Sequence, residues 1–419
     1  MGFLGGGNIG GCVYRLLEDM RAEIAERCQV SICVKKVLVK DRESFIPNGI
    51  PEELLVFDKD EVMNDPEITL VAEFMGGEHP AADFMLAALR HGKTVITANK
   101  VALATHWHEL QAEAEKQGVG LYYEASVGGA IPIIATLQHS MQANRIDKIM
   151  GIINGTTNYI LSRMDKEGAD YADVLRDAQR LGLAEPNPAF DVEGMDTAFK
   201  LSILASLSFH GRVTYEKVYR EGITEVTAQD IAYGKEMGYV LKLLAIAKRD
   251  GDRVEARVHP TFIRSNHPLA RVDGSFNAVY LHGHSCEDIT LQGYGAGTPT
   301  ASAVVSDILN AANAPTHYYD NFRNTAEADA SIHFTRNWES RYFIRLSAAD
   351  NPGVLAKVAV CFAEENVSIA TMMQKDAQAD GRVPMIFITH VAPERSVQAA
   401  LTRLDQSICQ IENVIRVEE

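Results

Sequence analysis

Residues that could carry chemistry gather over positions 183–200, where a glutamate, an aspartate and a lysine follow one another. Two prolines stop a helix from forming before Gly194, and beyond it apolar residues recur at helical spacing. On that helix Asp196 and Lys200 share one face, and Glu185 lies in the loop just ahead. Such a set could bind an amino-acid zwitterion and move a proton on an oxygen. An ordinary surface ion pair is the alternative for this segment alone.

A glycine-rich turn at the start of the chain has the spacing of a dinucleotide-binding fingerprint. Gly5, Gly7 and Gly10 match the pattern Gly-x-Gly-x-x-Gly, with Asn8 and Ile9 between the last two glycines. Such glycines let the backbone approach a pyrophosphate, which then lies at the N-terminus of the following helix. The turn therefore predicts a nucleotide cofactor.

The choice between NAD and NADP depends on the end of the second strand. A helix over 13–28 and a strand over 30–39 should follow the glycines, and the strand leads into Lys40, Asp41 and Arg42. An acid here accepts the ribose hydroxyls of NAD, whereas cations favour the 2′-phosphate of NADP. Since two cations flank one acid, NADP is favoured and NAD stays open. A solvated run of charges is the alternative.

Strands and helices alternate through the first 130 residues. Strands are expected over 69–75, 94–97 and 121–124, and a helix over 81–91. This alternation predicts a parallel, doubly wound sheet, in which ligands bind beyond the carboxyl ends of the strands. The residues at these ends are Gly76, Gly77, Asn99, Lys100 and the segment 124–129. We therefore expect them to line one pocket.

The alternation breaks down after Pro132, which indicates a second domain of the α+β class. Helices are expected over 133–143, 159–166, 171–183, 194–210 and 227–238. A strand is expected over 146–153, and strands over 240–248, 254–263, 277–284 and 288–293 are expected to form an antiparallel sheet. The polar turn over 154–158 could cap the helix that follows it.

The last third of the chain returns to the cofactor and then builds a third domain. Small residues over 293–301, including Gly297, precede a helix to about residue 313 and suit a phosphate or the nicotinamide side of a cofactor. Residues 314–339 are polar and weakly patterned, as in a linker. From Tyr342 onward the order β-α-β-β-α-β predicts a ferredoxin-like fold.

Composition excludes several classes of protein. A net charge of -16 argues against nucleic-acid binding, because phosphates would be repelled. No apolar run is long enough to span a bilayer. The 6 cysteines lack Cys-x-x-Cys spacing, so we expect reduced thiols and a cytoplasmic location.

Together these motifs resemble those of homoserine dehydrogenases that carry a C-terminal ACT domain, over nearly the whole chain. The motifs are Thr-Ala-Asn-Lys at 97–100, Glu-Ala-Ser-Val-Gly-Gly at 124–129, Gly-Ile-Ile-Asn-Gly-Thr-Thr-Asn at 151–158, Glu-Pro at 185–186, Asp-x-x-x-Lys at 196–200 and Gly-x-Gly-Ala-Gly-x-x-Thr-Ala at 293–301.

The resemblance implies roles for individual residues. Lys100 and Lys200 would be catalytic, with Asp196 beside them, and Glu185 and Asp196 would hold the substrate's amino and hydroxyl groups. Further substrate-binding residues would be Asn154, Gly155, Thr156 and Asp191. The cofactor would lie against Gly5, Gly7, Asn8, Ile9, Gly10, Lys40, Gly77, Thr97, Lys100 and Gly297. A monovalent cation, Na⁺ or K⁺, would bind Glu124 and the carbonyls of Val127, Gly129 and Ile131.

The resemblance also implies an organisation and partners. The implied domains are 1–130 for NAD(P) binding with a return segment over 294–315, 131–293 for catalysis and dimerisation, 316–339 as a linker and 340–419 as the ACT domain. The implied reaction interconverts L-homoserine and L-aspartate 4-semialdehyde in the biosynthesis of threonine, methionine and isoleucine. L-Threonine would be the effector at the ACT domain of a homodimer or homotetramer, although that domain could instead serve only oligomerisation.

The chemistry of these residues agrees with the implied reaction. Reduction of the semialdehyde requires a hydride on the aldehyde carbon and a proton on its oxygen, and a lysine ammonium can supply the proton. Lys200 qualifies if Asp196 keeps it oriented. Another amino-acid dehydrogenase and a non-catalytic nucleotide and amino-acid sensor are the alternatives. A pure sensor would not need the Glu185, Asp196 and Lys100 set, which favours an enzyme.

Overall fold

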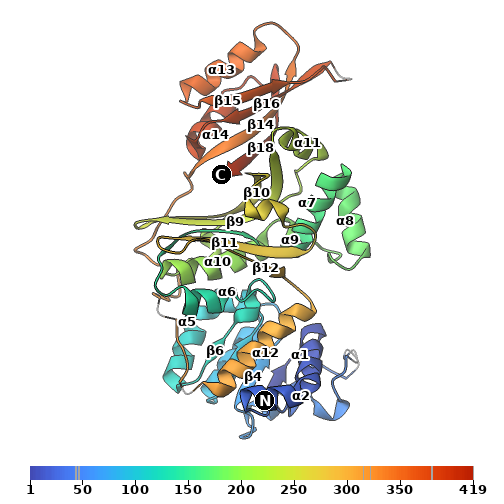
Figure 1. The fold of residues 1–419 in the computed structure, drawn as a ribbon, viewed down its shortest axis with the longest axis vertical. Coiled ribbons are helices and arrows are strands. Elements are labelled where there is room, and N and C mark those ends of the chain that lie inside the picture. The colour runs from blue at the N-terminus through green and yellow to red at the C-terminus, as the bar shows by residue number, and fades with distance from the viewer. Residues whose placement is uncertain (43–44, 46–47, 315, 321, 379–380, 419) are drawn as a thin grey trace.

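The computed structural model describes residues 1–42, 45, 48–314, 316–320, 322–378 and 381–418. Three units follow one another along the long axis of the molecule (Figure 1): a parallel sheet with its helices, a mixed sheet that packs on helices, and a small α/β unit at the C-terminal end. The predicted fold class is therefore confirmed for all three units.

The N-terminal unit is built on a parallel sheet whose order, β3-β2-β1-β4-β5-β6, is that of a doubly wound nucleotide-binding fold. Its strands are β1 Gly2–Leu4, β2 Lys36–Leu38, β3 Leu55–Val56, β4 Leu70–Glu73, β5 Thr94–Thr97 and β6 Leu121–Tyr122. The helices that follow them are α1 Asn8–Asp19, α2 Arg21–Cys28, α3 Lys59–Met63, α4 Ala81–Arg90 and α5 Lys100–Gln117. Strand order reverses between β1 and β4, which is where such sheets bind ligands.

Two predictions for this unit are wrong in their bounds. The helix predicted over 13–28 begins at Asn8, directly after the glycine turn, and breaks at Met20 into α1 and α2. The strand predicted over 30–39 is only the three residues of β2. Because β1 is itself three residues long, β2 pairs with it only from Gly2↔Lys36 to Leu4↔Leu38, and its pairing with β3 is shorter still. Strand β3 was not predicted.

Helix α12, Thr298–Asn313, returns to the N-terminal unit from the middle of the molecule. It packs beside α1 (Figure 1), and its Val304 and Ile308 are buried together with Val13 and Leu17 of α1. The small-residue turn before α12 therefore lies next to the glycine turn before α1.

The middle unit has the predicted antiparallel sheet, with the order β12-β11-β7-β9-β10. Its strands are β7 Ile146–Ile152, β9 Tyr239–Asp250, β10 Arg253–Arg264, β11 Phe276–Gly283 and β12 Glu287–Tyr294, with the short β8 Tyr219–Arg220 beside β10. Its helices are α6 Ile133–Ala135, α7 Gly155–Glu167, α8 Tyr171–Arg180, α9 Ala189–Val192, α10 Met195–Phe209 and α11 Ala228–Glu236.

Three helices of this unit differ from the prediction. The helix expected over 133–143 becomes a π-helical turn at 136–140, where the Thr136 hydroxyl donates to the Pro132 carbonyl at 2.6 Å. Helix α7 starts before residue 159, because the Asn154 side chain caps it. The proline-rich loop before Gly194 contains the single turn of α9.

Helix α10 lies at the centre of the middle unit. The sequence predicts one apolar face, yet every residue from Asp196 to Phe209 is buried except Lys200. Small residues such as Ala205 and Ser206 make this burial feasible, since Ser206 donates its hydroxyl to the Ser202 carbonyl at 2.7 Å. The one charged pair of α10 therefore faces a cavity and not the solvent around a surface helix.

The C-terminal unit has the predicted β-α-β-β-α-β order. Its main strands are β14 Glu339–Ala349, β15 Ile369–Gln374, β16 Arg382–Thr389 and β18 Cys409–Glu418, with the short β17 Ala392–Pro393. Its helices, α13 Val354–Glu364 and α14 Glu394–Thr402, bury Val358, Phe362, Val397 and Leu401 in the same core as the sheet.

The middle and C-terminal sheets are joined into one 12-stranded sheet. Three segments pair in parallel with the outer edge of β10: β13 (His333–Phe334) at one end, β8 in the middle, and β18 at Thr261↔Arg416 to Ile263↔Glu418. The segment predicted as a linker thus contributes β13 to this edge.

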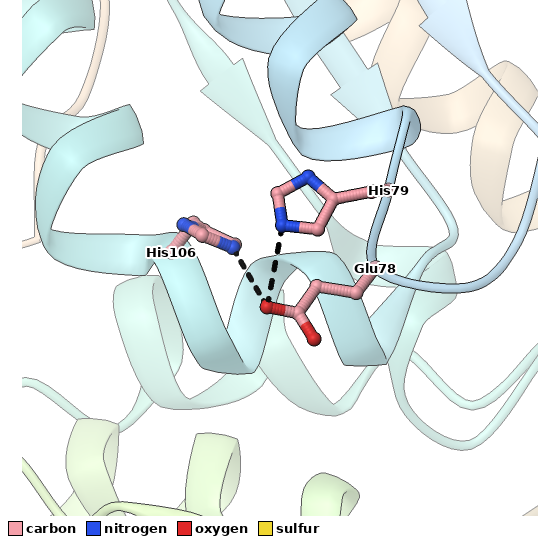
Figure 2. A group of neighbouring side chains, drawn as sticks. All are labelled: Glu78, His79 and His106. Carbon is pink, nitrogen blue, oxygen red and sulfur yellow. Dashed lines mark hydrogen bonds and ion pairs between the residues drawn. The ribbon is translucent and has the colours of Figure 1, made fainter.

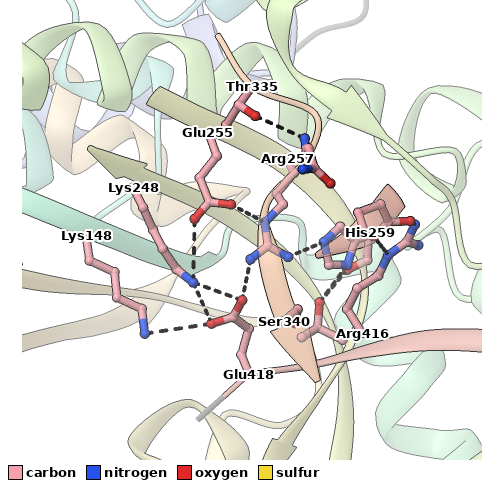
Figure 3. A network of polar contacts seen from close by, with 12 residues as sticks. Lys148, Lys248, Glu255, Arg257, His259, Thr335, Ser340, Arg416 and Glu418 are labelled. Atoms are coloured by element: carbon pink, nitrogen blue, oxygen red, sulfur yellow. Dashed lines mark hydrogen bonds and ion pairs between the residues drawn. The ribbon is translucent and has the colours of Figure 1, made fainter. Parts of the chain in front are cut away.

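Buried charges accompany the junction of β10 and β18. Figure 3 shows Glu418 of β18 among three cations of the middle unit: it pairs with Arg257, with Lys248 at 2.9 Å and with Lys148 at 3.9 Å. Arg345 of β14 makes a second buried ion pair across the junction, at 2.6 Å from Asp230 of α11. The C-terminal unit is therefore held by main-chain hydrogen bonds between strands and by ion pairs whose carboxylates are buried.

Candidate active site

A cavity of about 520 Å³ opens between the N-terminal and middle units. The predicted residues that line it are Ile9, Lys100, Gly129, Asn154, Gly155, Thr156, Asp191, Asp196, Lys200 and Gly297. Most of them come from α1, α5, α7, α10 and α12 or from the loops before these helices, while Gly129 precedes α6 and Asp191 lies on α9. The structure therefore brings together the two lysines and the two aspartates that the sequence singled out.

Asp196 is the centre of the polar contacts in this cavity. Its Oδ2 accepts from Lys200 Nζ at 2.6 Å and from Asn154 Nδ2 at 2.9 Å, and its Oδ1 lies 3.2 Å from Lys100 Nζ. The Lys200 ammonium also donates to the Ile153 carbonyl at 2.8 Å. The predicted pair of α10 is thus one part of a cluster with two cations and one anion.

The protonation state of Asp196 follows from this environment. The side chain is only 5% exposed, and burial by itself would raise its pKa. The charges of Lys200 and Lys100, together with hydrogen bonds from Lys200 and Asn154, outweigh burial and hold the pKa of Asp196 well below its ordinary value. Asp196 is therefore an anion that orients cations and not a proton donor near neutral pH.

Asn154 links the cap of a helix to the active site. Its Oδ1 accepts from the Thr157 amide at 2.9 Å, while its Nδ2 donates to Asp191 at 2.7 Å and to Asp196. The predicted helix cap is therefore confirmed, and the same side chain contacts two carboxylates that line the cavity.

Lys100 is the first residue of α5, directly after β5. The Asn99 side chain caps α5 by accepting from the Ala102 amide at 3.1 Å, and the Lys100 ammonium lies 5.5 Å from the centre of the Phe190 ring. A cap that fixes the start of the helix also fixes the direction in which Lys100 leaves it. Phe190, on α9, was not predicted.

A buried carboxylate that sequence reasoning missed supports this edge of the sheet. Glu73, at the end of β4, accepts from the Thr97 hydroxyl at 2.6 Å and from the Met75 amide at 2.6 Å. Burial raises the pKa of Glu73. The Thr97 hydroxyl therefore already has Glu73 as its hydrogen-bond acceptor. The Gly77 carbonyl accepts from Asn99 Nδ2 at 2.7 Å. A carboxylate ending an apolar strand was the signal available in the sequence.

A second cavity, of about 790 Å³, follows the glycine turn along the N-terminal unit. Its predicted lining residues are Gly5, Gly7, Asn8 and Lys40. Residues that were not predicted also line it: Phe45, Asn48, Phe57, Asp58, Lys59 and Phe84. Asn48 donates to the carbonyls of Gly6 and Gly7 at 2.6 and 2.8 Å, so it braces the turn from outside.

The shape of the glycine turn fits a dinucleotide. A Cβ on Gly10 would lie 2.7 Å from the Gly5 carbonyl, so only glycine allows α1 to start this close to β1. A Cβ on Gly7 would meet nothing within 4 Å, which leaves open space at the N-terminus of α1. Backbone amides facing such space suit a pyrophosphate.

The predicted cation ligands Glu124, Val127, Gly129 and Ile131 lie in the short segment between β6 and α6. Glu124 accepts from the Ile134 and Ala135 amides at 2.9 and 2.7 Å, and each of its oxygens keeps a further lone pair. The Ile131 carbonyl accepts from the Ile133 amide at 2.7 Å, and Val127 is buried beside the turn. Hard oxygen donors of this kind fit Na⁺ or K⁺.

Among the predicted catalytic and substrate-binding residues, Glu185 is the one that the structure leaves outside the cavity. It is exposed, and it lies two positions after Leu183, which does line the cavity. The Thr156 hydroxyl donates to the Leu183 carbonyl at 2.9 Å, which anchors this loop to the start of α7. Asp191 is the second carboxylate that lines the cavity in its place.

No helix among the described residues combines the length and the apolar character needed to cross a bilayer.

The doubly wound sheet, its glycine turn and a cavity with lysine and carboxylate groups define a nucleotide-binding oxidoreductase.

Comparisons with known proteins define the class further. Family models match residues 5–124 as the NAD-binding domain of homoserine dehydrogenase, 132–309 as homoserine dehydrogenase and 342–408 as an ACT domain. A homoserine dehydrogenase of Synechocystis is 40% identical over 100% of this chain and 99% of its own, and one of Mycobacterium tuberculosis is 41% identical over 99% and 96%.

Solved structures agree with the family models. The crystal structure of a homoserine dehydrogenase from Thiobacillus denitrificans has a TM-score of 0.91 and 37% identity, and covers 100% of this chain and 97% of its own. A hyperthermophilic archaeal homoserine dehydrogenase in complex with NADPH has a TM-score of 0.63 and 25% identity over 75% and 98%. The chain belongs to the homoserine dehydrogenase family. It is an oxidoreductase that uses a nicotinamide cofactor, and it carries an ACT domain.

Proposed function

We propose that the cavity between the N-terminal and middle units interconverts L-homoserine and L-aspartate 4-semialdehyde, with Lys200 as the group that exchanges a proton with the substrate oxygen. The observation that carries this proposal is the placement of Lys200 and Lys100 on the two oxygens of the buried Asp196. When bound, the nicotinamide cofactor supplies or accepts the hydride at the substrate carbon.

The geometry of Lys200 supports its role as proton donor. An ammonium has three N–H groups, and two of them are used by Asp196 and the Ile153 carbonyl. Because Lys200 lines the cavity, its third N–H is available to the substrate oxygen. Asp196 stays ionised, so it holds the ammonium in place and stabilises its charge without competing for the proton.

The other residues of the cavity would stabilise charge on the substrate oxygen and bind the substrate's ammonium and carboxylate groups. Lys100 adds a second positive charge near the oxygen, which would stabilise negative charge as it develops there. Asp191, with Asn154 beside it, and Glu185 from the loop would hold the substrate ammonium. Gly155 and Thr156, at the N-terminus of α7, offer backbone amides suited to the substrate carboxylate.

For the cofactor we propose NADP as the preferred form. Lys40 lines the nucleotide cavity at the end of β2, where a 2′-phosphate would lie, and the cavity also has Lys59 at its rim. Kinetics with NADP and NAD side by side on the Lys40→Ala variant test this, because loss of a 2′-phosphate partner raises KM for NADP alone. Equal changes for both cofactors would contradict the preference.

We propose further that a monovalent cation binds the Glu124 set, and that L-threonine acts through the C-terminal domain of a homodimer or homotetramer. Glu124 joins the end of β6 to the start of α6, so a cation there would stabilise the joint between the units and take no part in the reaction.

The effector site that we propose in the C-terminal domain is the turn at 350–353 before α13. This turn ends in Gly353, which has a φ of +89°, and the backbone amides at the start of α13 suit the carboxylate of an amino acid.

The central test is Lys200→Ala in the full-length enzyme. We expect kcat to fall by about two orders of magnitude or more, because proton transfer then depends on water, while cofactor affinity is unchanged. Lys235→Ala is the matched control, since Lys235 of α11 also pairs with an aspartate, Asp165 at 3.3 Å, but its side chain is exposed. A folded Lys200→Ala variant with most of its turnover would disprove the assignment.

A further inference from the structure

Two imidazoles and a carboxylate converge on the surface of the N-terminal unit, outside the cavities described above. Glu78 and His79 lie in the loop between β4 and α4, and His106 lies on α5. Figure 2 shows both rings directed at the same oxygen of Glu78: His106 Nε2 is 3.0 Å and His79 Nε2 is 3.7 Å from Glu78 Oε1. The three donor atoms lie within 4.8 Å of one another.

The separations of these atoms suit a metal ion. Ligands about 2.0–2.1 Å from a tetrahedral zinc ion are roughly 3.3 Å apart from one another, and the two measured contacts lie on either side of that value. Two nitrogens and one carboxylate oxygen are the donors that zinc and its neighbours in the first transition row prefer over magnesium or calcium. Water would complete the coordination, because Glu78 and His79 are exposed.

The second nitrogen of each imidazole also faces a carboxylate. His79 Nδ1 lies 2.9 Å from Asp83 Oδ2, and His106 Nδ1 lies 3.6 Å from Glu109 Oε2. A carboxylate at Nδ1 favours the tautomer that leaves a lone pair on Nε2, which is the nitrogen that points at the shared centre. Histidines that ligate metals have this arrangement as a rule.

The backbone holds the donors in place. At His106 the helix α5 departs from helical geometry, with φ −107° and ψ 15°, so the ring leaves the helix at a kink. The Asn99 side chain, at the start of the same helix, ties the Gly77 carbonyl at 2.7 Å. The loop that carries Glu78 and His79 is therefore hydrogen-bonded to the start of the helix that carries His106, without any ion.

From these observations we propose that Glu78, His79 and His106 form a site for a divalent transition-metal ion of the zinc type. The ion would join the loop after β4 to α5, whose first residue is Lys100, so occupancy of a surface site would act on the same helix that presents a residue of the active-site cavity. An acidic and histidine-rich surface without metal affinity is the competing explanation.

Cobalt(II) titration of the tag-free, full-length enzyme tests the site, because cobalt in a site of low coordination number absorbs visible light and zinc displaces it. We expect one equivalent to bind, and the His79→Gln/His106→Gln variant to lose at least about tenfold in affinity. The matched control is His282→Gln/His333→Gln. Each of those exposed imidazoles also lies beside a carboxylate, Asp288 at 2.8 Å and Asp252 at 3.4 Å.

The outcomes separate the two explanations. Binding that is kept in the control and weakened in the cluster variant supports the site, as does a similar loss in Glu78→Gln, which serves if the histidine variant fails to fold. Cobalt affinity that is equal in the wild type and the cluster variants overturns the proposal. Absence of a visible band in the wild type at about millimolar cobalt overturns it as well.

Discussion

Asp196 shows how one buried carboxylate can pair with two lysines and stay ionised. Its two oxygens are divided between Lys200 and Lys100, and Asn154 adds a neutral donor. Removing either lysine would leave part of a buried negative charge uncompensated, which costs several kcal/mol in the worst case. For that reason the Lys200→Ala variant needs a measured melting temperature beside its kinetics.

At the residue scale, the position of Glu185 yields a prediction. If this carboxylate binds the substrate ammonium, its part of the loop must move toward the cavity when substrate binds, because Leu183 and Asp191 line the cavity and Glu185, between them, does not. We expect Glu185→Gln to raise KM for homoserine by about tenfold and to leave kcat within about twofold, since only ground-state binding is lost.

The control for this loop is Glu193→Gln, which changes another exposed carboxylate of the same segment. It should leave both kinetic constants near those of the wild type. An unchanged KM in Glu185→Gln would mean that Asp191 binds the ammonium alone and that the loop stays where it is.

At the scale of elements, the cavity depends on a close approach of two backbones. The Gly129 turn contacts the segment that leads into α12: a Cβ on Gly129 would lie 2.6 Å from the Gly295 carbonyl carbon and 2.7 Å from the Tyr294 oxygen, and its φ is +59°. We expect Gly129→Ala to push the two segments apart, to lower kcat/KM by at least about tenfold and to lower the melting temperature.

Gly182→Ala is the matched control for this prediction. Gly182 lines the same cavity and has a φ of +72°, but its added Cβ would meet nothing within 4 Å. Backbone strain alone should therefore cost stability and little activity. Equal losses of activity in the two variants would show that strain, and not the approach of the two segments, is what matters.

Elements with a local signal were predictable from the sequence, and the pair on α10 is the best example. Four-residue spacing placed Asp196 and Lys200 on one face, and strand ends placed Lys100 in a pocket. Only the resemblance to homoserine dehydrogenases joined Lys100 to that pair. The burial of α10 on all sides was not predictable, because it comes from the α5 and sheet surfaces that enclose it. Glu73 and Asn48 were missed for the same reason, since their partners lie far away in the chain.

The pairing of β10 with β18 shows the same limit for the fold. Each strand has an ordinary alternating pattern, so each was predicted, but the pattern of a strand does not say which edge it joins. The ions that reinforce this pairing, such as Glu418 with Lys248 and Arg257, are also isolated charges in the sequence. Hence the domains were predicted as separate and the shared sheet was not.

At the scale of the whole molecule, Glu418 gives a pH-dependent contribution to stability. Burial would raise its pKa, but the charges of Arg257, Lys248 and Lys148 lower the pKa of Glu418 from 4.5 to about 2. A lowered pKa stabilises the folded state above pH 4.5, and this stabilisation is lost as pH falls toward 2. Glu418→Gln should therefore destabilise the protein by about 3 kcal/mol at neutral pH, because it leaves buried cations unpaired.

Thermal unfolding of Glu418→Gln and the wild type between pH 7 and about pH 3.5 measures this effect. The gap between the two melting temperatures should be constant above pH 4.5 and shrink below it. Glu412→Gln, on the same strand but about one-third exposed and 3.6 Å from Arg345, should show little gap at any pH. A Glu418→Gln gap that does not change with pH would rule out the ionic contribution.

The shared sheet also means that, during translation, β10 is made well before β18, the strand that pairs with its edge. About 150 residues separate the end of β10 at Arg264 from Arg416 of β18, and at roughly 5–20 residues per second the ribosome needs on the order of 10–30 s to supply them. Until then the Thr261–Ile263 edge of β10 has unpaired main-chain groups that could add a strand from a neighbouring nascent chain. Truncated translation products that lack β18 should therefore depend on chaperones more than the finished chain does.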